Sequence, residues 1–336
     1  MPKALITDVA GLTISPEERA FLRAADPWGF ILFKRNVDTP EQVRALVDSM
    51  RDAVGRADAP VLIDQEGGRV QRLGPPHWPV YPPGAHYAQL YDRGRQAGLA
   101  AARLGARLIA SDLAALGITV DCLPLADVPV SEADKIIGDR AYGTTPEKVA
   151  AIGAAVTEGL MEGGVLPVLK HLPGHGRATA DSHLALPVVA TERGVLESTD
   201  FAAFRPLAKL PLGMTAHVVF TAIDPVAPAT TSVTMVHEVI RGFIGFDGLL
   251  MSDDLSMNAL SGTLSERARA TLAAGCDMVL HCNGSLDERR EVADACPPFA
   301  GDAKRRADAA LAARRKPAPF DVAAAREQFA AMSASA

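Results

Sequence analysis

Eight short apolar runs, separated by longer segments with a helical pattern, constrain the fold of this chain more than any other feature. The runs are continuous and lack the alternation of apolar and polar residues that marks a strand with one exposed face. They lie at residues 4–7, 29–33, 61–64, 118–121, 165–169, 213–217, 248–252 and 277–281. Continuous runs suit strands buried on both faces, as in a parallel sheet. The sequence therefore predicts an α/β fold, and eight such strands suggest a closed (β/α)8 TIM-type barrel.

The segments between the runs carry helix signals. Thr145-Pro146-Glu147 is typical of an N-cap, a first-turn proline and a good helix former. We expect helices over residues 40–54, 93–116, 146–163, 232–241, 265–274 and 286–293. No Gly/Ser-rich linker divides the chain, so we expect one catalytic barrel domain over residues 1–336, with residues after about 302 as peripheral helices. No Gly-x-Gly-x-x-Gly follows the first run, which counts against a dinucleotide-binding fold.

Composition narrows the classes of partner. The chain has 336 residues and is 48% hydrophobic, which is enough to bury a substantial core. A net charge of -6 argues against a nucleic-acid partner, which would favour a basic surface. The N-terminus lacks the basic head and apolar stretch of a signal peptide, and no apolar run reaches transmembrane length. We therefore expect a cytoplasmic enzyme with no membrane partner, whose four cysteines are buried free thiols.

Polar residues follow one run after another at the same end. In a barrel, catalytic groups come from the C-terminal ends of several strands. The residues at these ends are Asp64, Asp121, Lys170, His171, His217, Asp253, Asp254 and His281. A buried, hydrogen-bonded structural role is an equal alternative for Asp121, His217 and His281. The repetition at one end nevertheless favours a functional site there.

Asp64 and Arg72 form the first informative pair. A carboxylate accepts hydrogen bonds from hydroxyl groups and a guanidinium donates several in a fixed fork, so together they suit a polyhydroxylated ligand. The alternative is an internal salt bridge that braces the loop. Glu66, between them, could be catalytic or could brace the turn. Arg140 is a candidate ligand clamp, with a plain surface arginine as the alternative.

The loop that begins at Lys170 and ends at His183 admits two chemistries. In the first, Asp181 orients the imidazole of His183, which acts as general acid and base. In the second, a divalent metal for hydrolysis is held by His171, His175, Asp181 and His183. Spacing alone does not separate the two, although Pro173-Gly174 fits a mobile loop better than a converged set of ligands.

Asp253 supplies the partner that the first chemistry needs. A carboxylate at a strand end can attack an electrophilic carbon and form a covalent ester. For a glycoside this is the retaining route, which requires a nucleophile and an acid/base. Two consecutive aspartates point in different directions, and a cap or loop role suits Asp254 better than Asp253.

These stretches, in this order, resemble the family 3 glycoside hydrolases, and more narrowly the bacterial β-N-acetylglucosaminidases of peptidoglycan recycling. The resemblance covers roughly residues 5 to 285. It is carried by residues 29–36, 64–72, 138–143, 170–176, 181–183 and 252–257. One departure is Leu172, where the Lys-His-x-Pro-Gly-His-Gly motif is expected to have an aromatic residue. It leaves the polar groups in place.

The resemblance implies hydrolysis of terminal β-linked N-acetylglucosamine with retention, without a metal or an organic cofactor. It implies that Asp253 is the nucleophile and that His183 is the acid/base, supported by Asp181. The sugar would be held by Asp64, Arg72, Arg140, Lys170 and His171. The implied substrate is a small disaccharide or muropeptide, N-acetylglucosamine linked to 1,6-anhydro-N-acetylmuramic acid with or without peptide. We expect the chain to act as a monomer.

Two hypotheses concern the loop. A neutral imidazole at His183 would activate water without placing a second full negative charge beside Asp253, and a mobile loop could withdraw His183 while substrate enters. We expect a structural role for His175. Three other classes stay open: a phosphorylase, since a neutral acid/base tolerates an incoming phosphate; a metal-dependent hydrolase; and a catalytically silent sugar-binding protein.

Overall fold

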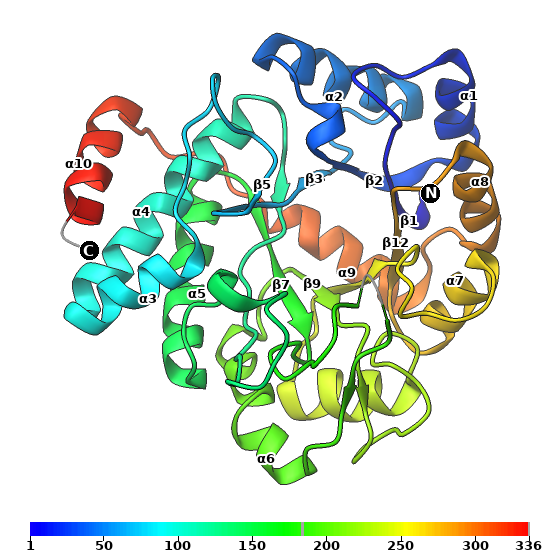
Figure 1. The fold of residues 1–336 in the computed structure, drawn as a ribbon. Coiled ribbons are helices and arrows are strands. Elements are labelled where there is room, and N and C mark those ends of the chain that lie inside the picture. The colour runs from blue at the N-terminus through cyan, green and yellow to red at the C-terminus, as the bar shows by residue number, and fades with distance from the viewer. Residues whose placement is uncertain (183–184, 335–336) are drawn as a thin grey trace.

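The structure is a computed structural model that describes residues 1–182 and 185–334. Within these residues, eight parallel strands close into a barrel in the order β1-β12-β11-β9-β7-β6-β3-β2 (Figure 1). They are β1 (Lys3–Thr7), β2 (Pro27–Leu32), β3 (Val61–Ile63), β6 (Val120–Asp121), β7 (Leu166–Leu172), β9 (Leu212–Thr215), β11 (Leu249–Asp254) and β12 (Met278–His281). Each corresponds to one predicted run, and the pairing of Ile6 with Leu280 closes the barrel. The predicted barrel is confirmed.

Two buried clusters explain why the runs are continuous. Alternate strand residues such as Ile6 and Leu62 belong to one cluster, which fills the inside of the barrel. Their neighbours, such as Leu5, Val61 and Ile63, belong to a second cluster shared with the surrounding helices. Both faces of each strand are therefore buried, so neither face needs polar residues. The four cysteines lie buried with free thiols, as predicted.

Helices surround the barrel largely where the sequence predicts them. The matching helices are α2 (Pro40–Val54), α4 (Arg95–Ala114), α5 (Pro146–Glu162), α7 (Leu264–Ala273) and α8 (Leu286–Ala295). The helix predicted over 232–241 begins three residues later and is a π-helix, η5 (Met235–Ile244). Three helices were not predicted: α1 (Pro16–Ala25), α3 (Gly84–Arg93) and α6 (Arg193–Ser198). In α1, Ser15 and Glu18 cap each other's backbone N–H groups at the N-terminus.

Two C-terminal helices, α9 (Gly301–Ala312) and α10 (Val322–Ala334), follow the last strand. Helix α10 lies against α4, at the left edge of the molecule in Figure 1. The Phe329 ring contacts the buried Tyr87 ring with 6.4 Å between centroids, and Arg326 pairs with Asp112 at 2.8 Å. The predicted extra C-terminal helices are therefore present: α10 lies on the outside of the barrel, whereas α9 contributes Ala307 and Ala310 to the cluster that fills its inside.

Short strands and single-turn helices lie between the main elements, and two of them, at 201–203 and 205–207, contact α5. Strands β4 (Gln65–Gly67) and β5 (Val70–Gln71) form an antiparallel pair after β3, and β8 (Val188–Val189) pairs with β10 (Val219–Phe220). Single-turn helices lie at η1 (Lys34–Asn36), η2 (Gly138–Arg140), η3 (Phe201–Ala203) and η4 (Arg205–Leu207). In the described ranges, no helix is both long enough and apolar enough to cross a membrane.

Candidate active site

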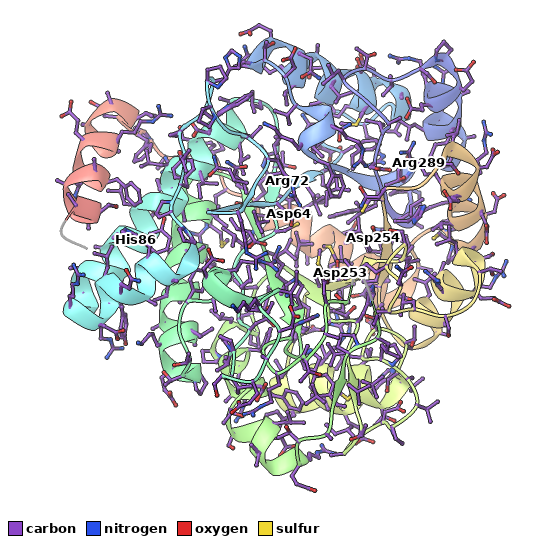
Figure 2. The ribbon with its side chains drawn as sticks, in the orientation of Figure 1. Asp64, Arg72, His86, Asp253, Asp254 and Arg289 are labelled. Atoms are coloured by element: carbon purple, nitrogen blue, oxygen red, sulfur yellow. The ribbon has the colours of Figure 1, made fainter. Side chains whose placement is uncertain are left out.

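Most of the polar residues at the strand ends meet in one cavity. Figure 2 shows Asp64 and Arg72 near Asp253 and Asp254 at the centre of the molecule, with Arg289 out on α8. Six of the predicted site residues line this cavity: Asp64, Arg72, Arg140, Lys170, His171 and Asp253. Asp181 is not among the lining residues, although its neighbour Ser182 is. His183, the predicted acid/base, lies outside the described residues.

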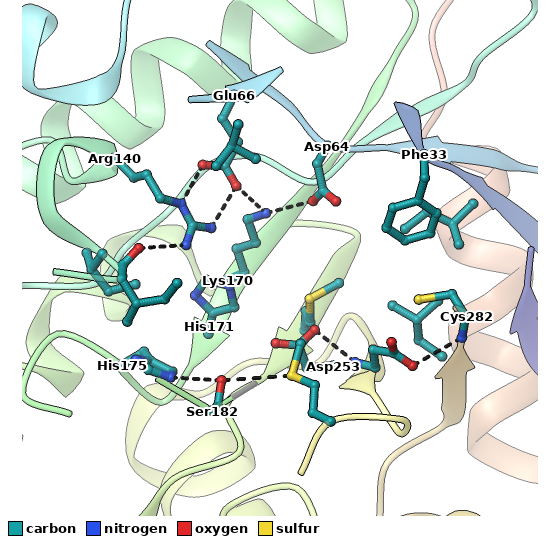
Figure 3. Close-up of a pocket in the computed structure, with 18 of the residues that line it drawn as sticks. Phe33, Asp64, Glu66, Arg140, Lys170, His171, His175, Ser182, Asp253 and Cys282 are labelled. Atoms are coloured by element: carbon teal, nitrogen blue, oxygen red, sulfur yellow. Dashed lines mark hydrogen bonds and ion pairs between the residues drawn. The ribbon is translucent and has the colours of Figure 1, made fainter. Parts of the chain in front are cut away.

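One wall of the cavity is a chain of five charged side chains with alternating sign, of which Arg140, Glu66, Lys170 and Asp64 are labelled in Figure 3. Arg140 donates from Nε and Nη2 to the two oxygens of Glu66, each at 2.8 Å. Lys170 Nζ lies 2.6 Å from Glu66 Oε1 and 3.0 Å from Asp64 Oδ1. Arg72 Nη2 donates to Asp64 Oδ2 at 3.0 Å. The Asp64–Arg72 pair is therefore a salt bridge and part of the cavity wall at once.

The ion pairs keep Asp64, Glu66 and Lys170 charged at neutral pH. Burial by itself would raise the pKa of Glu66, but Arg140 and Lys170 outweigh burial and lower it to about 2. For Asp64, Lys170 and Arg72 outweigh burial in the same way and hold its pKa well below the usual range. Burial would lower the pKa of Lys170, but Glu66 and Asp64 raise it. Glu66 is thus ionised and bound through both oxygens to cations, which favours bracing over proton transfer.

A carboxylate that the sequence reasoning missed, Asp127, lies behind His171. It is fully buried in the segment that follows β6. His171 Nδ1 lies 2.7 Å from Asp127 Oδ2, and the backbone N–H of His175 donates to Asp127 Oδ1 at 2.6 Å. The sequence signals Asp127 only by its position. It directly follows the apolar stretch Cys122-Leu-Pro-Leu-Ala126, and the other site residues also follow apolar runs.

His175 is buried beside this pair and lines the cavity. Its Nε2 lies 3.3 Å from Ser182 Oγ, so it contacts the segment that carries the proposed acid/base (Figure 3). Burial and the neighbouring His171 lower the pKa of His175 to about 4. His175 is therefore neutral at pH 7.

The two consecutive aspartates of β11 both line the cavity, but they differ in burial and in hydrogen-bond partners. Asp254 is buried, and its carboxylate accepts hydrogen bonds from the backbone N–H of Cys282 and from Asn283 Nδ2, both at 3.1 Å. Asp253 is only half-buried, and the backbone N–H of Asp254 donates to its Oδ1 at 2.8 Å. Asp254 therefore ties β11 to the end of β12, while Asp253 is available to a ligand.

The remaining strand-end candidates do not line the cavity. Asp121 accepts the backbone N–H of Gln65 at 3.0 Å, and burial raises its pKa well above the usual range. His217 is buried between Thr230 Oγ1 at 2.7 Å and the carbonyl of Asp254 at 3.0 Å. Among the described residues, no group of three or more His, Cys, Asp or Glu side chains is arranged to hold a metal ion.

Comparison with known proteins gives a consistent result. A profile of the glycosyl hydrolase family 3 N-terminal domain matches residues 5–297. A β-hexosaminidase of Alkalilimnicola ehrlichii is 42% identical over 283 residues, which cover 83% of this chain and 80% of that protein. A β-hexosaminidase of Methylococcus capsulatus is 39% identical over 280 residues, 82% of this chain and 81% of that protein. A crystal structure of NagZ from Neisseria gonorrhoeae, in complex with N-trifluoroacetyl-D-glucosamine, is 31% identical with a TM-score of 0.86, covering 99% of this chain and 97% of that one.

Proposed function

Because this chain belongs to glycosyl hydrolase family 3 and is a glycoside hydrolase with β-N-acetylhexosaminidase activity, we propose that it removes a terminal β-linked N-acetylglucosamine with retention of configuration, through an ester on Asp253. The observation that carries this proposal is the half-buried Asp253 carboxylate at the end of β11, in the same cavity as the five-residue charged wall. A nucleophile on one strand end and sugar-binding groups on the others is the arrangement that such a reaction needs.

The charged wall suits a sugar with several hydroxyl groups. Arg72, Arg140 and Lys170 supply donors, and the carboxylates of Asp64 and Glu66 supply acceptors. Because these groups already hold one another in place, little ordering remains to be done when the sugar binds. The N-acylated glucosamine named for the NagZ structure of N. gonorrhoeae is a ligand of this chemical class.

Asp253 is the proposed nucleophile. The N–H of Asp254 binds its Oδ1 and fixes the rotation of the carboxylate, and we assign attack on the anomeric carbon to Oδ2. The new bond joins Oδ2 to that carbon as the bond to the leaving oxygen breaks. Water then attacks the same carbon and releases the sugar, so two inversions give net retention.

His183 is the proposed acid/base, supported by Asp181. It would protonate the leaving oxygen in the first step and take a proton from water in the second. Support comes from Ser182, the residue before His183, which lines the cavity and contacts His175. A neutral base here avoids a second negative charge beside Asp253.

The proposed substrate is N-acetylglucosamine linked to 1,6-anhydro-N-acetylmuramic acid, with or without peptide, as it arises in cell-wall recycling in the cytoplasm. We propose that the enzyme acts as a monomer with one catalytic domain and that it needs no metal or organic cofactor. Activity that survives exhaustive chelation is the expected result.

The nucleophile can be tested by trapping. A slow fluorinated N-acetylglucosamine analogue should leave a covalent sugar, and peptide mapping should place it on Asp253. Asp253→Asn should lose more than about a thousandfold in turnover, because the nucleophile is gone. A label on Asp254, or near-native turnover by Asp253→Asn, would contradict the assignment of Asp253 as the nucleophile.

Product analysis in phosphate buffer distinguishes a hydrolase from a phosphorylase. We expect free N-acetylglucosamine as the product, and a sugar 1-phosphate would indicate a phosphorylase instead.

A further inference from the structure

The contacts of Asp127 bear on which atom His171 presents to a ligand. Asp127 is 0% exposed, both of its oxygens have partners, and one of these contacts is the backbone N–H of His171, which donates to Oδ1 at 3.4 Å. Oδ2 lies 2.7 Å from His171 Nδ1, and Oδ1 accepts the backbone N–H of His175 at 2.6 Å. Burial by itself would raise the pKa of Asp127, but His171 and the hydrogen bond from the backbone N–H of His175 outweigh burial and lower it. Asp127 is therefore an ionised carboxylate and can only accept hydrogen bonds.

An acceptor at this position decides the tautomer of His171. Because Asp127 Oδ2 accepts, the proton of a neutral imidazole must lie on Nδ1. The other ring nitrogen then carries a lone pair, and His171 lines the cavity. The hydrogen bond made by one ring nitrogen sets the protonation of the other in this way at many histidine sites.

We propose that Asp127 is a positioning residue for hydrolysis, whose carboxylate holds the His171 ring with its proton on Nδ1, so that His171 offers the Nε2 lone pair to a hydroxyl group of the sugar. The proposal rests on the proposed function, since it places a sugar in this cavity.

The rest of the cavity wall explains why such an acceptor matters. Each carboxylate oxygen of Asp64 and Glu66 already accepts a hydrogen bond from Arg72, Arg140 or Lys170. Among the described residues, no lysine or arginine is recorded as a partner of His171 Nε2, so this atom can serve as an acceptor. A hydroxyl group that receives a hydrogen bond from one of the cations can donate its own proton to Nε2, so both of its hydrogen-bonding roles are satisfied.

Asp127→Asn tests the proposal with little change in shape. The amide has one acceptor oxygen, so it cannot accept from both the His175 backbone and His171 Nδ1. If the amide oxygen of the variant still accepts the backbone N–H of His175, the amide NH2 group donates to His171 Nδ1. The proton of the neutral His171 ring must then lie on Nε2. We expect kcat/KM for a chromogenic β-N-acetylglucosaminide to fall about 10- to 100-fold, as for other residues that orient a histidine.

His171→Asn completes a double-mutant cycle. The amide nitrogen of asparagine replaces Nδ1 as a donor to Asp127, so the buried charge keeps a partner while the Nε2 lone pair is lost. If Asp127 acts through His171, Asp127→Asn should change kcat/KM by less than about threefold in the His171→Asn background. If the losses in kcat/KM of the two single variants multiply in the double variant, the proposal is overturned. Asp127 would then act through another contact, such as the His175 backbone.

Asp121→Asn is the matched control. Asp121 is also a fully buried aspartate at the end of a strand, but it accepts from the Gln65 backbone and does not line the cavity, and none of the described histidines is recorded as its partner. Its amide variant should keep kcat/KM within about threefold of the wild type. If Asp121→Asn lost as much kcat/KM as Asp127→Asn, the assignment would be overturned. The loss would then follow from replacing any buried aspartate at this end of the barrel and not from the contact with His171.

The tautomer can be read without any substrate. Long-range 1H–15N spectra at pH about 9 should show His171 of the wild type protonated on Nδ1, with the proton moved to Nε2 in Asp127→Asn. A wild-type ring protonated on Nε2 would overturn the proposal. Absence of turnover by the wild type would refute the proposed function, while the spectra would still decide the Asp127–His171 arrangement.

Discussion

Glu66 shows, at the scale of single residues, how the cavity wall is held before a sugar binds. Its carboxylate lies between Arg140 and Lys170, and both cations line the cavity. Without that charge, the two cations would repel each other and turn away from the positions that a sugar needs. Alternating charge therefore fixes the geometry of the wall, and preorganised polar groups of this kind act without reorganisation when substrate arrives.

Replacing Glu66 by glutamine should affect both binding and stability. The side chain keeps its shape but leaves two buried cations undercompensated, which costs about 2–4 kcal/mol of unfolding free energy. Displaced cations should also lower kcat/KM about 10- to 100-fold. Urea unfolding and steady-state kinetics at pH 7 measure the two effects. Unchanged kinetics would mean that Glu66 braces only the turn.

The same variant gives a pH test with a defined sign. The pKa of Glu66 is lowered from 4.5 to about 2, so the folded state favours the ionised form. Its stabilising contribution is present above about pH 4.5 and is lost as the pH falls towards 2. Urea unfolding of the wild type should therefore lose stability more steeply in this window than Glu66→Gln does. If the unfolding free energy of both proteins depended equally on pH in this window, the lowered pKa of Glu66 would be contradicted.

At the scale of elements, the end of β7 and the loop after it are hydrogen-bonded to the segment after β6. The N–H of Ala126 donates to the carbonyl of Lys170 at 2.7 Å, and the N–H of Asp134 donates to the carbonyl of Ala178 at 2.8 Å. Between these contacts, Gly176 lies so close to Val128 that an added Cβ would be 2.1 Å from the Val128 carbonyl oxygen. A glycine is required here for close approach of two backbones.

Gly176→Ala should therefore lift the loop away from its support. We expect kcat/KM to fall about 10- to 100-fold, since a displacement of about 1 Å near a catalytic site has this effect. Gly194→Ala in α6 is the control, because a Cβ there meets nothing within 4 Å. It should keep wild-type kinetics. Equal kinetics for both variants would show that the contact at Val128 does not position the loop.

At the scale of the whole molecule, stability and catalysis are separable because α10 lies outside the barrel. Phe329 packs on Tyr87, and α10 packs on α4 at the edge of the molecule, away from the barrel strands (Figure 1). Phe329→Ala should lower the unfolding free energy by about 1–3 kcal/mol, since the ring is only half-buried. KM and kcat should not change.

The control is Glu327→Ala, an exposed position on the same helix, which should change the unfolding free energy by less than about 0.5 kcal/mol. Thermal unfolding of both variants should follow one cooperative transition if the chain is one domain. A changed KM in Phe329→Ala would show that α10 is coupled to the cavity.

Several features could be predicted from the sequence because they depend on local pattern. Buried strands need apolar residues on both faces, so eight continuous runs indicated the barrel. Polar residues that interrupt the same end of these runs indicated Asp64, Lys170, His171 and Asp253 as neighbours. Helix α1 carried a readable signal as well, since Ser15 and Glu18 have the spacing of a reciprocal cap, and it was overlooked.

The tertiary structure alone decided the features that depend on partners distant in the chain. Glu66 braces the wall because Arg140 and Lys170 reach it from 74 and 104 residues further along the chain. Asp127 has no motif that reveals its partner, and its link to His171 arises because two neighbouring barrel strands end side by side. Local patterns report which backbone a segment favours and which faces it buries. The charge states and tautomers of the site depend on which side chains the closed barrel brings within hydrogen-bonding distance.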